Sequence, residues 1–322
     1  MIDQRTLLVG IDEAGYGPNL GPLVVTAVWA SVPSETRGAS LWHALGAEVS
    51  RWPGAAESLV VDDSKRVYSA GGLKPLERLA LAWMGVVRGV PSTLRDLWHR
   101  HSLTPSSDLD EVACAADRDV AIPHVSDTDA IGRAVDLLRR ALHQAQFECA
   151  GVACQIVLPH RFNDLLQKED SKSTALFRVN AELLRHVWQV SDAARIEVTA
   201  DKHGGRNFYG TLLQEAFAET LVLAGREGAA ASEYTVSAGG RQLRARFVPR
   251  ADADHLFVAA ASMISKYIRE LWMGLFNSFW TREVPGLDAT AGYPEDARRF
   301  WNAIEPAAHR LSVPRQLIWR AK

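Results

Sequence analysis

The chain has 322 residues, of which 47% are hydrophobic and 23% are charged, and its formal net charge is −2. A chain of this length can bury a core without staples, and three cysteines without a CxxC pair argue against a disulfide framework and a zinc ribbon. No apolar run approaches about 18 residues and no signal peptide is evident, so we expect a soluble, cytoplasmic protein without membrane contact. At first sight, the near-neutral charge also argues against a nucleic-acid partner.

Two apolar runs near the N-terminus predict a pair of antiparallel strands. They cover residues 7–11 and 23–29, and they flank a turn segment rich in glycine and proline. Helical spacing follows at 73–90. Seven acidic residues against the single base Arg118 then mark 105–129 as an exposed acidic segment, and this segment is a candidate surface for a protein partner.

The second half of the chain alternates between helical and strand patterns. Helices mixed with strands predict an α/β domain with a partly antiparallel sheet. Asp254 is expected at the start of the longest helix, as its N-cap or first-turn acid. In chain order, the patterns predict a helix at 131–142, a strand at 153–158, a helix at 173–190, a strand at 195–200, a helix at 207–224, a hairpin at 234–248, a long helix at 254–280 and a short helix at 294–304.

Four carboxylates stand next to these predicted elements. Asp12 and Glu13 follow the first strand, Asp201 follows the strand 195–200, and Asp252 precedes the long helix. If the strands lie side by side, these groups meet at one edge of the sheet, where they would raise one another's pKa. Two Mg²⁺ or Mn²⁺ ions about 4 Å apart would remove that repulsion and clamp a phosphodiester for hydrolysis. A solvated acidic turn is the alternative for Asp12 and Glu13 taken alone.

Five blocks along the chain resemble, in order, the motifs of type 2 ribonucleases H (the ribonuclease HII family). The specific ones are the first block and the run Ala260-Ala261-Ser262-Met263-Ile264-Ser265-Lys266. The blocks are Gly10-Ile11-Asp12-Glu13-Ala14-Gly15-Tyr16-Gly17-Pro18 with Gly21-Pro22-Leu23-Val24-Val25, Asp63-Ser64-Lys65, Thr199-Ala200-Asp201, Asp252 with the serine-containing run and Arg269-Glu270, and Gly292-Tyr293-Pro294.

The resemblance implies a ribonuclease H-like fold, in which helices flank a central mixed sheet. The catalytic domain would span 1–280, with insertions at about 91–170 and 210–250, and a helical extension at 281–322 would pack beside the active site. The family cuts the RNA strand of RNA–DNA hybrids or cuts at ribonucleotides embedded in DNA, and it recognises the 2′-hydroxyl. The implied catalytic ligands of two Mg²⁺ or Mn²⁺ ions are Asp12, Glu13, Asp201 and Asp252, and the implied substrate-binding residues are Gly15, Tyr16, Gly17, Lys65, Lys266 and Tyr293.

Several of these residues also have a plainer interpretation. Tyr16 stands where the family commonly has an arginine between two glycines, so the specificity for a ribonucleotide junction stays open, and the ring either stacks on substrate or packs. Tyr293 either stacks near the cleaved bond or is a half-buried turn tyrosine, and the two lysines either bind phosphate or serve as surface or supporting residues. His203 either shuttles a proton or is merely exposed. A second Asp-Ser-Lys at 170–172 has no family counterpart and is attributed to chance.

Two other functions remain open at this point. One is a nuclease of the same fold that cuts DNA or structured RNA, and the other is a nucleic-acid-binding protein without catalysis. The charge does not exclude either function. Residues 105–129 have a net charge of −6, so the rest of the chain has a net charge of +4, and the two sum to −2. Arginines on the hairpin 234–248 and its end, together with the basic tail 297–322, are expected to track phosphates.

Overall fold

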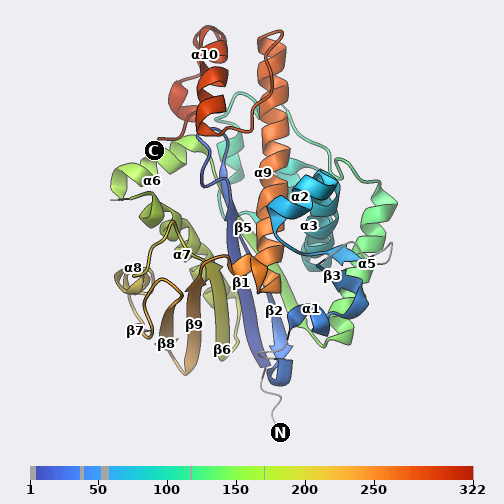
Figure 1. Cartoon of the computed structure of the whole chain (residues 1–322), viewed down its shortest axis with the longest axis vertical. Coiled ribbons are helices and arrows are strands. Elements are labelled where there is room, and N and C mark those ends of the chain that lie inside the picture. Colours follow the sequence, from blue (N-terminus) through green and yellow to red (C-terminus); the bar gives the residue numbers. More distant parts are fainter. Residues whose placement is uncertain (1–4, 37–39, 52–57, 117, 170, 322) are drawn as a thin grey trace.

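The fold is built around a seven-stranded mixed sheet, shown in Figure 1. The computed structural model describes residues 5–36, 40–51, 58–116, 118–169 and 171–321. The strand order across the sheet is β5-β2-β1-β6-β9-β8-β7, and β3 pairs with β4 in a separate two-stranded ladder. The strands are β1 Arg5–Ala14, β2 Leu23–Pro33, β3 Val49–Ser50, β4 Leu59–Val60, β5 Glu148–Val157, β6 Arg195–Asp201, β7 Leu221–Ala224, β8 Ser232–Ala238 and β9 Arg241–Val248.

The directions of the three central strands determine where the site can form. β1 pairs antiparallel with β2, as predicted from the sequence, and β2 pairs antiparallel with β5. β6 runs parallel to β1, and β9 runs parallel to β6. The carboxyl ends of β1, β6 and β9 therefore meet at one edge of the sheet.

Helices cover both faces of the sheet (Figure 1). The long α9 packs on β1 and β2, and α3 packs beside α9 and on β5. Because α7 covers the opposite face, one hydrophobic core lies on each side of the sheet. Because successive strand residues point to opposite faces, Leu8 joins one core and Leu7 and Val9 join the other. None of the helices in the described ranges is both long and apolar enough to cross a lipid bilayer. The helices are α1 Leu41–Ala44, α2 Ser64–Gly71, α3 Leu73–Arg88, α4 Leu94–His101, α5 Thr128–Gln144, α6 Pro159–Lys168, α7 Lys172–Val190, α8 Gly210–Ala216, α9 Leu256–Glu283 and α10 Pro294–Arg310.

The predicted fold class is confirmed, since helices flank a central mixed sheet, but two local expectations are wrong. The helix predicted at 207–224 is only the short α8, and Leu221–Ala224 instead forms β7, which pairs with β8 at the edge of the sheet. An apolar run this short is compatible with a helix or a strand, and here the pairing with a neighbouring strand determines its conformation. Asp254 does not start the long helix, because α9 begins at Leu256 with His255 as its N-cap.

The acidic segment 105–129 is also less exposed than predicted. Asp108 is completely buried and forms an ion pair with Arg161 of α6. Leu109 and Val112 lie in the core beside it. Asp117, one of the seven acids, lies outside the described residues. Part of this segment is therefore packed structure, and its use as a partner surface stays a prediction.

The C-terminal region forms the end of the molecule that carries α10 (Figure 1). α10 lies beside the last turns of α9, where the rings of Phe300 and Phe276 are 5.5 Å apart. The chain then returns to the loop between β1 and β2, where Trp319 forms an isolated bridge with Leu20. The helical extension after residue 280 is thus present, and the division into a 1–280 domain and an extension stays a prediction.

Candidate active site at the carboxyl ends of the central strands

Four predicted carboxylates lie at the sheet edge where β1, β6 and β9 end. The sequence predicted that Asp12 and Glu13 follow the first strand. β1 instead continues to Ala14, so both are strand residues. Asp201 is the last residue of β6, and Asp252 lies in the 3-10 turn Ala251–Ala253 that follows β9. Each of the four has a raised pKa, and repulsion from another member of the group is among the causes for three of them.

Asp12 and Glu13 show the strongest effects. Burial raises the pKa of Asp12 well above its usual range, and the charges of Glu13, Asp201 and Asp252 add to the rise. Burial and the charge of Asp201 raise the pKa of Glu13 to about 8, against a smaller opposing effect of Lys65. A carboxyl group that stays protonated near neutral pH is a sign of an unbalanced negative cluster.

Asp63 is a fifth carboxylate near this cluster. It caps α2 by accepting hydrogen bonds from the backbone amides of Lys65 and Arg66. Its charge follows burial among the causes that raise the pKa of Asp252. Asp63 belongs to the Asp63-Ser64-Lys65 motif, but it was not among the predicted site residues. Its place in that motif, two positions before a predicted phosphate-binding lysine, could have indicated it.

The chemistry of this donor set fits a hard divalent cation. All of the clustered groups are carboxylates, which suit Mg²⁺ or Mn²⁺ better than a soft metal. Their mutual repulsion and burial are the costs that a bound cation removes. In the described part of the chain, however, no three His, Cys, Asp or Glu side chains are grouped tightly enough to enclose an ion. The assignment of Asp12, Glu13, Asp201 and Asp252 as metal ligands therefore stays a prediction.

Serine side chains fix the position of Asp12. Ser262 of α9 hydrogen-bonds its carboxyl group, and the Ser262 hydroxyl lies 3.0 Å from the hydroxyl of Ser64 at the start of α2. The Ser265 hydroxyl lies 3.2 Å from the Asp12 carbonyl oxygen and 2.8 Å from the Thr26 hydroxyl. Sequence reasoning did not assign a role to these serines. Their position inside an otherwise apolar helix was the available signal, because a buried hydroxyl needs a partner.

The loop that follows β1 carries three of the predicted substrate-binding residues. Gly15 has φ +89°, and a side chain there would overlap the carbonyl oxygen of Pro22, so only glycine fits. Tyr16 is half-buried, and its hydroxyl end lies near Gly204 of the loop after β6. A Cβ added to Gly17 would lie 3.7 Å from the Tyr293 ring. The loop is thus shaped by glycine and stands beside Tyr293.

The remaining predicted binding residues differ in their surroundings. Tyr293 is 53% exposed, which leaves its ring available to a ligand rather than packed in a turn. Lys65 is exposed, and its charge acts on both Glu13 and Asp201. Lys266 instead pairs with Glu270 and lies 4.6 Å from the centre of the Tyr68 ring. All of these substrate roles stay predictions, and that of Lys266 would require it to leave Glu270.

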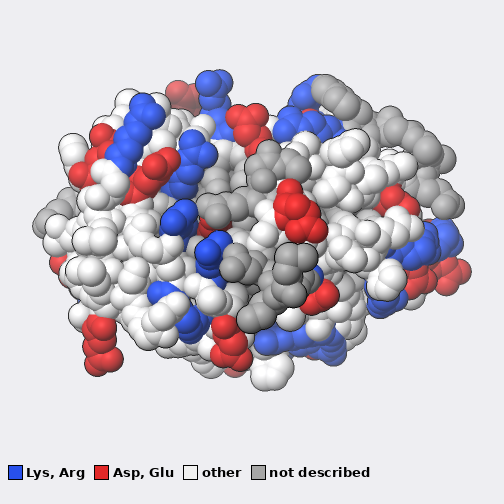
Figure 2. Space-filling view, turned by 90° about the horizontal axis from the view of Figure 1, so that it is seen from below, with Lys and Arg blue, Asp and Glu red and all other residues white. Residues whose placement is uncertain are grey.

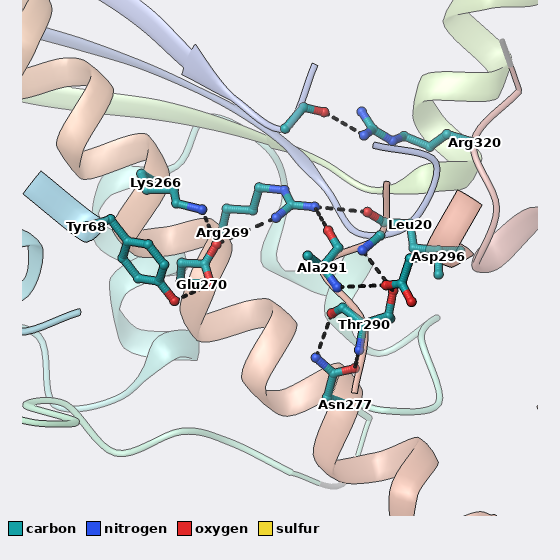
Figure 3. Close-up of polar contacts among 12 residues, drawn as sticks. Leu20, Tyr68, Lys266, Arg269, Glu270, Asn277, Thr290, Ala291, Asp296 and Arg320 are labelled. Atoms are coloured by element: carbon teal, nitrogen blue, oxygen red, sulfur yellow. Dashed lines mark hydrogen bonds and ion pairs between the residues drawn. The ribbon is translucent and has the colours of Figure 1, made fainter. Parts of the chain in front are cut away.

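Two buried arginines hold the loop 15–22 in place (Figure 3). Arg269 of α9 reaches the carbonyl oxygens of Leu20 and Ala291, at 3.2 and 3.1 Å. Arg320, near the C-terminus, donates to the carbonyl oxygens of Gly15 and Pro18. Burial and the charge of Arg269 lower the pKa of Arg320 to about 9. The loop is therefore braced from α9 and from the C-terminal tail.

This brace corrects the expectation that the basic tail tracks phosphates. Arg320 is 1% exposed and bonds to backbone, and Arg315 lies between the rings of Trp301 and Trp319. Arg241 of the hairpin also bonds to backbone. It is the first residue of β9, at the end away from Asp252, and it donates to the carbonyl oxygens of three residues that precede β6. Basic residues predicted to contact a ligand thus serve partly as buried supports.

His203 is neither exposed nor placed to shuttle protons. It is 1% exposed and lies among the rings of Phe177, Tyr209 and Phe247. Burial, with a contribution from Arg206, lowers its pKa to about 3, so the imidazole is neutral at physiological pH. Both interpretations that the sequence left open are therefore wrong, and His203 is a core residue.

No family model and no curated protein matches this chain. Among solved structures, it is similar to the PCNA:RNase HII complex from Archaeoglobus fulgidus, with a TM-score of 0.43 at 14% identity, over 98% of this chain and 94% of that chain. It is also similar to Bst-RNase HIII in complex with Mn²⁺, with a TM-score of 0.41 at 14% identity, over 98% of this chain and 66% of that chain. For the ribonuclease H2 from Pyrococcus horikoshii OT3 the TM-score is 0.39 at 15% identity, over 97% and 92%. Across nearly its whole length, the chain is thus similar to solved ribonucleases of the HII and HIII types.

Proposed function

We propose that this protein is a metal-dependent endonuclease that hydrolyses the RNA strand of RNA–DNA hybrids or cuts at ribonucleotides embedded in duplex DNA. One observation carries the proposal. Asp12, Glu13, Asp201 and Asp252 come from distant parts of the chain, stand in blocks that resemble ribonuclease HII motifs, and lie together at one sheet edge with raised pKa values.

The carboxylates would hold two Mg²⁺ or Mn²⁺ ions, which supply an activated water and stabilise the leaving oxygen of the phosphodiester. The chain's own residues hold the site in shape. Ser262 and Ser265 fix Asp12 from α9, and the backbone amide of Ala251 donates to Asp201 at 3.4 Å. The exposed ring of Tyr293, next to Gly17, offers a surface on which a sugar or base can stack.

Tyr16 favours a second candidate, a nuclease of the same fold with another substrate. The arginine that the resembling family carries between the two loop glycines is absent, so a contact to the ribonucleotide is changed. DNA or structured RNA would then be cut by the same carboxylates. A binding protein without catalysis is disfavoured, because four clustered carboxylates repel a nucleic-acid backbone unless metal ions neutralise them.

Cleavage assays with three labelled duplexes distinguish these functions. An RNA–DNA hybrid, a DNA duplex with one ribonucleotide and an all-DNA duplex are incubated with Mg²⁺ or Mn²⁺. We expect cleavage of the hybrid or of the duplex with one ribonucleotide, and none of the all-DNA duplex. Asp12→Asn should abolish cleavage. Asp254→Asn is the matched control, because Asp254 is exposed and lies outside the cluster, and its rate should equal that of the unmodified protein. Cleavage of DNA alone would favour the second candidate. No cleavage of any of the three duplexes would sink the first candidate, and no cleavage of a labelled RNA hairpin either would sink the second.

A further inference from the structure

Lys172 lies against Tyr16, although the two are far apart in the sequence. Lys172 is the first residue of α7, and its ammonium nitrogen is 4.8 Å from the centre of the Tyr16 ring. The sequence had attributed the Asp-Ser-Lys at 170–172 to chance. Asp170 lies outside the described residues, and Lys172 lies beside the loop of the candidate site.

Arg206 brings a second positive charge to the same place. It follows Asp201 in the loop after β6, and its Nη2 donates to the hydroxyls of Ser171 and Ser173, at 3.3 and 3.1 Å, and of Thr174. Its Nη1 donates to the carbonyl oxygen of Phe208 at 3.4 Å, and its Nε has no hydrogen-bond partner among the described residues. Burial and the charge of Glu13 raise the pKa of Tyr16, whereas the charge of Arg206 opposes this rise, so the ring of Tyr16 is near enough to both Glu13 and Arg206 to feel their charges.

This combination of groups is suited to an anionic oxygen. A guanidinium, an ammonium and hydroxyl groups are the side chains that most often contact backbone phosphates. The face of an aromatic ring attracts an ammonium group and helps to position it. Tyr16 packs against the core on the α7 side of the sheet, and Lys172 belongs to α7.

We propose that Tyr16, Lys172 and Arg206 form a contact for a backbone phosphate of the nucleic acid next to the cleaved bond. This inference rests on the proposed function and deepens it. The charge that the resembling family places on one loop residue is supplied here from α7 and from the loop after β6. Such a contact recognises the phosphate charge and does not involve the 2′-hydroxyl. It should therefore strengthen the binding of RNA–DNA hybrids and of DNA to the same extent.

Binding measurements test this contact apart from cleavage. The Asp12→Asn protein, in Mg²⁺, is titrated with a labelled hybrid and a labelled DNA duplex across a series of salt concentrations, with fluorescence anisotropy as the readout. Lys172→Ala and Arg206→Ala should each weaken both complexes and reduce the slope of log affinity against log salt by about 1. Arg206→Lys keeps the charge and should retain the slope.

Arg185→Ala is the matched control. It removes one exposed positive charge from the same helix, about 20 Å further along α7, and should leave the slope unchanged. If Arg206→Ala lowers the melting temperature strongly, its binding data are set aside, and the salt slopes of Lys172→Ala and Arg206→Lys test the contact. With Asp12 intact, Lys172→Ala should raise KM and leave kcat close to that of the unmodified enzyme.

The outcomes separate this inference from the proposed function. If the protein cuts hybrids but Lys172→Ala and Arg206→Ala bind like Arg185→Ala, the phosphate contact is wrong and the nuclease stands. If the slopes fall as expected in a protein that cuts nothing, the contact stands and the nuclease is wrong. A change in hybrid affinity with no change in DNA affinity would also overturn the inference, because it would show that the cluster reads the ribose.

Discussion

At the level of single residues, Glu13 couples the stability of the metal-free protein to pH. Its pKa rises from 4.5 to about 8 on folding, through burial and the charge of Asp201. Between these values, the folded chain holds a proton that the unfolded chain has released, so the free energy of unfolding falls as the pH rises. Urea unfolding in EDTA should show this loss, and Glu13→Gln should reduce it. A stability that rises with pH over this range, equally in both proteins, would contradict the assignment.

Arg320 determines how well the loop 15–22 is ordered. Arg320→Ala removes the donors to Gly15 and Pro18, and we expect a loss of about 1–3 kcal/mol in stability because those buried oxygens lose their partners. Amide hydrogen exchange should become faster in 15–22, and KM for a cleaved duplex should rise more than kcat falls. Arg320→Lys should recover part of both effects. Arg298→Ala, an exposed change on α10, is the control, and equal exchange in the two alanine variants would refute the brace.

At the level of elements, the contact between β1 and α9 depends on Gly10. A methyl group at this position would overlap the backbone of Phe257 and Val258. Gly10→Ala should therefore destabilise the protein by about 3 kcal/mol or more, because neither backbone can yield. Gly132→Ala is the matched change, since nothing lies within 4 Å of that exposed position in α5, and it should stabilise by about 0.5–1 kcal/mol. Chemical denaturation measures both, and a neutral Gly10→Ala would disprove the close approach.

The acidic segment offers a similar pair of changes. Asp108 is buried and paired with Arg161, whereas Asp110 is 62% exposed and pairs with Arg95 at 2.8 Å. Asp108→Ala leaves part of the Arg161 guanidinium without its partner, so we expect a loss of about 3 kcal/mol, somewhat relieved because Arg161 is partly exposed. Asp110→Ala should cost at most about 1 kcal/mol. Equal melting temperatures for the two variants would show that the segment is not packed as described.

Local patterns were enough to predict most elements, and long-range contacts explain the rest. The helix 173–190 and the strand 195–200 match α7 and β6 closely, because their apolar spacing is a property of the segment itself. β7 was missed because its pairing with β8 decides its conformation. The convergence of the carboxylates was predictable from their positions at element ends, but the burial of Asp108 and the Tyr16–Lys172 contact were not, because each joins distant segments.

At the level of the whole molecule, charge is distributed in two ways. Figure 2 views the molecule from below, the end away from α10, where lysine and arginine are interspersed with aspartate and glutamate. At the candidate site, by contrast, clustered carboxylates raise one another's pKa, and the charge of Lys65 opposes this rise for Glu13. The net charge of −2 therefore did not report on function. Under the proposed function, what matters is the local negative cluster, which metal ions would neutralise, and the positive residues beside it.

Metal binding should stabilise the whole fold. Because the carboxylates repel one another when ionised, Mg²⁺ or Mn²⁺ should bind the folded state in preference to the unfolded chain and raise the melting temperature. At an ion concentration of about 100 times Kd, the gain is about 2.7 kcal/mol. Asp12→Asn should lose most of this gain, and Asp254→Asn should retain it. A melting temperature that is indifferent to both ions in the unmodified protein would argue against a metal site.

The brace from Arg320 to Gly15 joins residues that are 305 positions apart. On a ribosome that adds about 5–20 residues per second, the loop would be synthesised about 15–60 s before its arginine. All four carboxylates emerge before Arg320 as well. Before Arg320 is made, a nascent chain can assemble the acidic cluster while the loop 15–22 is still unsupported. The order of synthesis thus delays a fully braced loop until the tail has been made.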